Sequence, residues 1–133
     1  MDFLRLALSV ALMLAAPFAA AGADAAPHKT IPAAFHGRWD RDVDGCANLE
    51  SNQRIVIDAT TISYYEDGDT VVSVTARGPD RIDLVVDYEN YDGSERRNRT
   101  LSLSDAGETL TFSYADGAQY VNYRCPQGNP HGE

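Results

Sequence analysis

The chain has 133 residues, and its 20 Asp and Glu outnumber its 11 Lys and Arg, so the formal net charge is −9 at pH 7. A chain this acidic repels phosphate backbones and anionic lipid surfaces, which argues against nucleic acid as a partner. Its length is that of one small domain.

Residues 1–25 are predicted to be a secretory signal peptide and not part of the fold. Arg5 lies in a short head, residues 6–21 are almost all apolar, and Ala-x-Ala pairs end at Ala21 and Ala25, the order of features that a signal peptide shows. An uncleaved anchor is the alternative, but the apolar run is shorter than the roughly 20 residues that a membrane span usually needs. We therefore expect cleavage, a periplasmic or extracellular location, and no membrane insertion of the mature chain.

The rest of the chain divides into three parts. Residues 26–36 hold two prolines and no hydrophobic period, and are predicted to be an extended lead-in. Residues 37–126 are predicted to be a single β-barrel domain, and residues 127–133 a C-terminal tail.

From Trp39 onward, apolar residues alternate with polar ones in short runs separated by Gly, Asp and Asn, the pattern of half-buried antiparallel strands. The predicted fold class is therefore all-β, with eight strands and no helix longer than a turn. The residues expected to face inward are Trp39, Ile55 and Ile57, Ile62 and Tyr64, Val72, Val74 and Ala76, Ile82, Leu84, Val86 and Tyr88, Leu101 and Leu103, Leu110, Phe112 and Tyr114, and Val121 and Tyr123. In the last strand the same alternation places Cys125 inside and, unless a bulge intervenes, Arg124 outside.

Eight strands joined in order by tight turns form a meander, which removes its exposed edges most easily by closing into an up-and-down antiparallel barrel. A two-sheet sandwich is the competing architecture. Cys46 lies near the first strand and Cys125 at the end of the last. In an exported chain, two cysteines most simply form one disulfide, and this one would join the two sides of the seam.

The stretch Gly37-x-Trp39, which follows Phe35 at the entry to the first strand, resembles the calycin superfamily, the lipocalins above all, as does Arg124 at the end of the last strand. The resemblance implies a calycin-like barrel in which Trp39 closes the floor and Arg124 packs over it. The mature chain also resembles small exported bacterial proteins that share the F-x-G-x-W stretch and a terminal cysteine pair. More loosely, it resembles small bacterial metalloprotease inhibitors.

The stretch Asp40-x-Asp42-x-Asp44-Gly45 matches the first half of a calcium-binding loop, in which alternate carboxylates converge on the ion. The twelfth position is Ser51, where a bidentate acid is required. We therefore favour a solvated acidic turn. A weak calcium site completed by Glu50 or Asn48 is the alternative.

One basic cluster stands out in this acidic chain, formed by Arg96, Arg97 and Arg99. An anion site is one interpretation of it. We favour a charged strand paired with acidic neighbours across a hairpin, with Asp83, Asp87 and Glu89 as the partners.

The sequence shows no catalytic motif and predicts no cofactor. We expect a non-enzymatic exported binding or interaction protein, with a small apolar ligand or a protein partner, on a barrel filled mainly by its own side chains. The alternative is an inhibitor module whose lead-in, residues 27–35, acts as an inserted arm. Deleting such an arm would leave the thermal midpoint almost unchanged.

Overall fold

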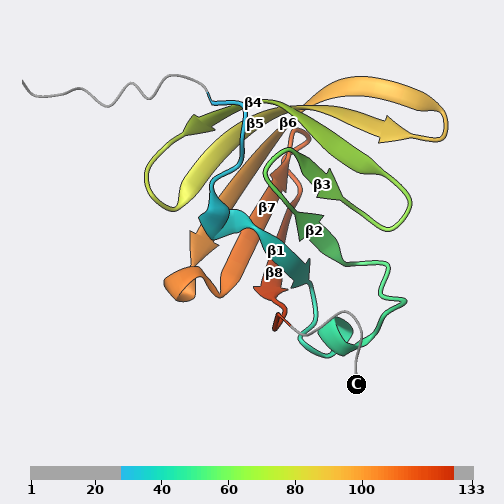
Figure 1. The fold of residues 1–133 in the computed structure, drawn as a ribbon, viewed down its shortest axis with the longest axis vertical. Coiled ribbons are helices and arrows are strands. Elements are labelled where there is room, and N and C mark those ends of the chain that lie inside the picture. Colours follow the sequence, from blue (N-terminus) through green and yellow to red (C-terminus); the bar gives the residue numbers. More distant parts are fainter. Residues whose placement is uncertain (1–27, 128–133) are drawn as a thin grey trace, which may run out of the picture.

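Eight antiparallel strands, each paired with the next along the chain, form a closed barrel in the computed structural model, which describes residues 28–127 (Figure 1). The predicted signal peptide and the end of the predicted tail, residues 128–133, lie outside the described residues. The strands are β1 (Gly37–Asp40), β2 (Ile55–Ile57), β3 (Thr61–Ser63), β4 (Gly68–Ala76), β5 (Arg81–Asn90), β6 (Gly93–Ser104), β7 (Thr109–Tyr114) and β8 (Gln119–Arg124). The predicted all-β, up-and-down barrel is confirmed.

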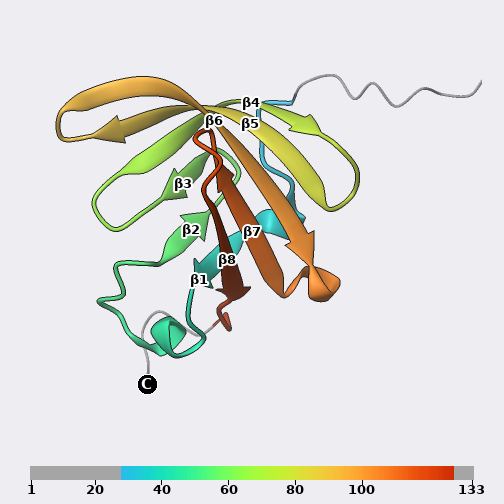
Figure 2. The same cartoon turned by 180° about the vertical axis from the view of Figure 1, so that it is seen from behind.

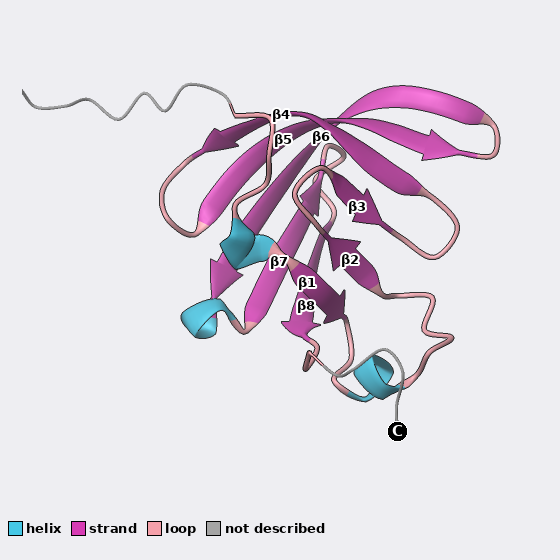
Figure 3. Ribbon diagram, in the orientation of Figure 1, coloured by secondary structure: helices cyan, strands magenta, loops and turns pink. Residues whose placement is uncertain are grey.

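Helical structure within residues 28–127 is limited to three 3₁₀ turns, η1 (Ala33–Phe35), η2 (Asp44–Ala47) and η3 (Asp105–Gly107) (Figure 3). No helix of the described part of the chain has the length and apolar character needed to cross a bilayer.

The barrel closes where β1 pairs with β8. Trp39 lies opposite Arg124 and Asp40 opposite Tyr123. The predicted disulfide between Cys46 and Cys125 is formed beside this seam, with the two Cα atoms 5.3 Å apart. The Cys125 amide also donates a hydrogen bond of 2.9 Å to the Arg38 carbonyl. The eight strands form one closed sheet and not the two-sheet sandwich that was the competing prediction.

The core lies inside the barrel, and most of the predicted inward positions supply it. Its members are Ile31, Phe35, Trp39, Ile55, Ile57, Ile62, Val74, Ile82, Leu84, Val86, Leu101, Leu103, Leu110 and Phe112. Both views of the ribbon show the strands wrapping around this interior, with the lead-in crossing one end (Figures 1 and 2). Apolar side chains from every strand except β8 therefore form one continuous core.

Two stretches depart from the predicted alternation. The β4–β5 register shifts between Val71 and Ser73, so Val72 occupies a bulge and Val71 packs against the core in its place. A bulge adds one residue and reverses the parity of the positions before it.

In β8 the predicted inward set is wrong. Val121 and Tyr123 are exposed, while Asn122 is fully buried. Its Nδ2 donates to the Leu110 carbonyl at 3.4 Å, whereas its Oδ1 has no hydrogen-bond partner within residues 28–127. Asn122 and Arg124 are two positions apart, so they share a face of the strand, and the guanidinium of Arg124 lies over Trp39.

The lead-in closes one end of the barrel. Ile31 and Phe35 are 2% and 1% exposed, respectively. The backbone of His28 forms two hydrogen bonds with Val74, and the Ile31 amide donates to the Ala59 carbonyl at 2.8 Å. Ile31 and Phe35 thus belong to the core, and residues 28–35 are held against the barrel and do not form a free arm.

Arg124 and Trp39 join the lead-in to the barrel. The Arg124 guanidinium carbon lies 4.2 Å from the Trp39 ring centroid, within the range of a cation–π contact. The same guanidinium donates to the carbonyls of Ala34, His36 and Gly107 at 2.8 to 2.9 Å. Gly37 has a φ of +127°, and a Cβ there would lie 3.4 Å from Arg124.

Candidate functional site

The opposite end of the barrel holds a polar hollow of about 230 Å³. Its walls come from the ends of β1, β3, β5 and β7, from the long strand β6, and from the segment that enters β2. The lining residues are Arg41, Asn52, Gln53, Arg54, Ile55, Tyr64, Asp67, Tyr88, Arg97, Arg99 and Tyr114. We call this hollow the Arg–Tyr cup, because arginines and tyrosines make up most of its wall.

The basic cluster of β6 divides between the outside and the inside of the barrel. Arg96 pairs with Asp87 across the hairpin, with nitrogen–oxygen distances of 2.9 and 3.2 Å, as predicted. The prediction is wrong for the other two arginines. Arg97 pairs with Glu95 of its own strand, and Arg99 is 3% exposed inside the barrel. Both line the cup, since they continue the inward face that Leu101 begins.

A buried ion pair forms the floor of the cup. Arg99 donates from Nε and Nη2 to the two oxygens of Asp69 at 2.9 and 3.1 Å, a bidentate geometry. The Tyr64 hydroxyl donates to the same carboxylate at 2.5 Å. Burial acts to lower the pKa of Arg99, but the hydrogen bonds and charge of Asp69 outweigh it and raise that pKa. Arg99 therefore stays protonated.

Burial, together with the charge of Asp69, raises the pKa of Tyr64 above its ordinary value of 10.0. The Tyr64 contribution to stability is therefore fully present below about pH 10 and is lost as the pH rises above the unfolded-state pKa. We expect the free energy of unfolding to fall more steeply above pH 10 in the natural protein than in Tyr64→Phe, which has no phenol to ionise at that position. Urea unfolding at a series of pH values measures this difference. Parallel curves for the two proteins would contradict it.

The remaining tyrosines of the cup are also held neutral. A hydrogen bond to Asp67 raises the pKa of Tyr88, and burial raises that of Tyr114. The guanidinium of Arg97 lies 3.9 Å from the Tyr88 ring centroid, and that of Arg99 lies 5.0 Å from the Tyr114 centroid. The hydroxyls of Tyr64 and Tyr88 donate to protein carboxylates. The other polar groups of the lining are the guanidinium groups, Asp67, the Asn52 and Gln53 side chains and the Tyr114 hydroxyl.

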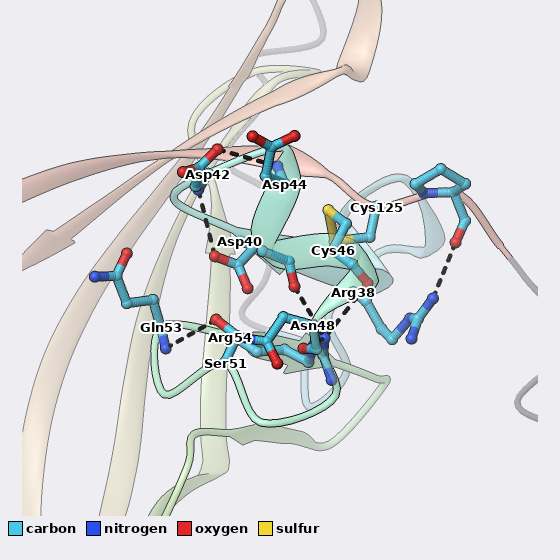
Figure 4. Close-up of a disulfide and its surroundings, with 12 residues drawn as sticks. Arg38, Asp40, Asp42, Asp44, Cys46, Asn48, Ser51, Gln53, Arg54 and Cys125 are labelled. Carbon is cyan, nitrogen blue, oxygen red and sulfur yellow. Dashed lines mark hydrogen bonds between the residues drawn. A yellow bond between two sulfur atoms is a disulfide. The ribbon is translucent and has the colours of Figure 1, made fainter.

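The acidic stretch after β1 adopts turn geometry. Asp40 Oδ1 accepts from the Asp42 amide at 3.3 Å, and Asp42 Oδ1 accepts from the Asp44 amide at 3.0 Å (Figure 4). Within residues 28–127, no group of three His, Cys, Asp or Glu side chains is placed to hold a metal ion. Asp40 and Asp42 each use one carboxylate oxygen as the acceptor for the amide two residues further on, and the buried Oδ2 of Asp40 has no hydrogen-bond partner within residues 28–127.

The expected solvated turn is wrong for Asp40, which is 1% exposed. Gly45 permits this burial, because a Cβ there would lie 2.5 Å from Asp40 Oδ1. Arg54 holds the rest of the loop, and its Nη2 donates to the carbonyls of Gly45, Cys46 and Asn48 at 3.2, 3.4 and 2.5 Å. A resident guanidinium thus binds the loop carbonyls.

The residues predicted to be structural, and the two cysteines, lie away from the cup. Gly37, Trp39 and Arg124 meet where the lead-in crosses the barrel, and the Cys46–Cys125 disulfide lies at the seam. None of them lines the cup. Their positions are those of residues that hold the fold together.

Known protein families, curated proteins and solved structures include no match to this chain. Function is therefore inferred from the geometry of the molecule itself.

Proposed function

We propose that the protein is an exported, non-enzymatic binding protein with a calycin-like barrel, and that the Arg–Tyr cup is its ligand site. The observation that carries the proposal is a buried charged side chain, Arg99, at the floor of a hollow inside a barrel end. Concave sites with a few convergent polar groups are where small ligands bind. Export is proposed from the predicted signal peptide and agrees with the disulfide.

The cup favours a small ligand that carries a polar group over the wholly apolar one suggested by the sequence. At about 230 Å³, it lies below the range of roughly 300–1,000 Å³ typical of drug-sized ligands. Its lining includes four arginines and a single aliphatic residue, Ile55. An apolar molecule placed there would strip water from charged groups without replacing their hydrogen bonds.

Binding is proposed in preference to catalysis because of the chemistry of the lining. Within the described residues, the cup wall includes no histidine, cysteine, serine or lysine, the side chains that most often act as nucleophiles or proton carriers near neutral pH. The pKa values of Tyr64, Tyr88 and Tyr114 are raised, away from neutrality. An inhibitor module is not favoured, because it would need the lead-in as a free arm, and Ile31 and Phe35 of the lead-in are buried in the core.

Blocking the mouth of the cup tests the proposed site. Asn52 is an exposed lining residue, so Asn52→Trp should fill the mouth without disturbing the core. We expect benzoate or benzamide, used as small planar probes, to bind the natural protein in calorimetric titrations and to lose at least about tenfold in affinity in the variant.

Thr60→Trp is the matched control, since Thr60 is also exposed and uncharged but lies in the β2–β3 turn at the opposite end. It should bind as the natural protein does. Equal binding to both variants would place the ligand site elsewhere, and binding of neither probe to the natural protein would contradict the proposed function.

A further inference from the structure

The cup contains guanidinium nitrogens that the protein leaves with weak partners or none. Arg99 uses Nε and Nη2 for Asp69, whereas its Nη1 makes one contact, to the Asn98 carbonyl at 3.5 Å. The Nε of Arg54 is buried and has no hydrogen-bond partner within residues 28–127. Unpaired buried donors are costly, so an acceptor bound beside Arg54 and Arg99, two residues that line the cup, would be favourable.

Arg41 supplies a cation at the rim of the cup. Its guanidinium carbon lies 3.6 Å from the Tyr120 ring centroid. No carboxylate of the described residues forms an ion pair with it. Tyr120 in turn makes an edge-to-face contact with Tyr114, a lining residue, at 5.7 Å between ring centroids. The aromatic contact holds Arg41 near the opening without neutralising its charge.

Among the side chains that line the cup and the carboxylates paired with them, one positive charge is left over. Four arginines line it, at positions 41, 54, 97 and 99, and the carboxylates among or bound to them are Asp67, Asp69 and Glu95. The raised pKa values of the lining tyrosines keep these side chains uncharged at neutral pH. The cup is therefore locally positive, although the whole chain has a net charge of −9. This local charge attracts an anion that the rest of the protein surface repels.

We infer that the ligand of the cup is a small monoanion, a carboxylate carried on a flat apolar group. One negative charge balances the surplus, and a carboxylate offers the two in-plane acceptors that guanidinium groups recognise. Tyr64, Tyr88 and Tyr114 also line the hollow, and aromatic side chains supply apolar surface for the rest of the ligand. This inference rests on the proposed function, which assigns the cup as the binding site.

A pair of isosteric probes tests the charge of the ligand. Benzoate and benzamide have nearly the same shape, and only benzoate is charged. In calorimetric titrations of the full mature chain at constant ionic strength, we expect benzoate to bind at least about tenfold more tightly, because charge-assisted hydrogen bonds are roughly twice as strong as neutral ones. Inorganic phosphate, a compact anion without a flat group, should bind more weakly than benzoate.

Arg41→Gln should remove most of the preference for benzoate. Arg41 is exposed, so the substitution leaves the core intact. Arg81→Gln is the matched control, because Arg81 is an exposed arginine at the start of β5 that does not line the cup. It should keep the preference of the natural protein.

The outcomes separate the two proposals. Equal affinity for benzoate and benzamide would overturn the monoanion and leave the cup as a binding site. Tighter binding of phosphate would overturn the flat carboxylate, and an unchanged preference in Arg41→Gln would overturn the role of the surplus charge. Binding of neither benzoate nor benzamide would overturn the proposed function together with the inference.

Discussion

Phe35→Ala is expected to lower the free energy of unfolding by about 3–5 kcal/mol, the usual cost of removing a buried phenylalanine. Phe35 is 1% exposed and packs with Ile31 and Trp39 in the core. Its carbonyl also accepts a hydrogen bond of 3.1 Å from the Trp39 indole. The lead-in therefore stabilises the barrel, which is the reverse of what a free inhibitory arm would do.

Urea unfolding of Phe35→Ala beside Tyr91→Ala measures this effect against an aromatic residue that is 96% exposed. The control should change stability by no more than about 0.5 kcal/mol. A change that small in Phe35→Ala would mean that the lead-in does not belong to the core.

Asp69→Ala is expected to cost about 3–5 kcal/mol of stability, because it leaves Arg99 as an uncompensated charge in the barrel interior. The two side chains are 0% and 2% exposed, so solvent screens their interaction little. The Tyr64 hydroxyl would lose its acceptor as well. Most of the loss reflects the unpaired guanidinium, not the net value of the ion pair.

The double variant Asp69→Ala/Arg99→Met separates these contributions. Replacing a buried pair by apolar groups is often neutral or stabilising, so the double variant should be more stable than Asp69→Ala alone. Urea unfolding of the four proteins in the mutant cycle gives the coupling free energy. Strictly additive single effects would contradict a direct interaction between the two side chains.

The sequence predicts the fold well where alternation is regular. In β5 the apolar residues Ile82, Leu84 and Val86 are all buried, as their spacing indicates. The meander of eight strands and the cysteines at its two ends predict closure, because a closed barrel makes its first and last strands neighbours. These features depend on local periodicity and chain order, which a single sequence contains.

The failures occur in β4, where a bulge changes the parity, and in β8, where the apolar residues lie on the outward face. In β4 the bulge at Val72 reverses the inward face of the preceding residues, and this brings Asp69 inside. In β8 the apolar side chains of Val121 and Tyr123 face outward while Asn122 is buried. The burial of Asn122 is supported by hydrogen bonds from its side-chain amide to the carbonyls of Leu110, on the neighbouring strand β7, and Tyr120, and the first of these contacts cannot be derived from local spacing.

The cup was partly predictable. Because side chains alternate along a strand, positions 99 and 97 share the inward face of Leu101 in β6. This signal is easily overlooked, since arginine is usually exposed. Asp69, the ion-pair partner of Arg99, is 30 positions away in the sequence. The register that joins them depends on the β4 bulge, so the ion pair could not be derived from spacing alone.

The central claim is that one end of the barrel is filled by the lead-in and the other end is an anion-binding cup. Amide and arginine Nε–H nuclear magnetic resonance signals, followed during a titration with benzoate, test this claim most directly. We predict saturable shifts at Arg41, Arg97 and Arg99, with no change at Ile31 and Phe35. Shifts at the lead-in end, or shifts spread over the surface without saturation, would contradict it.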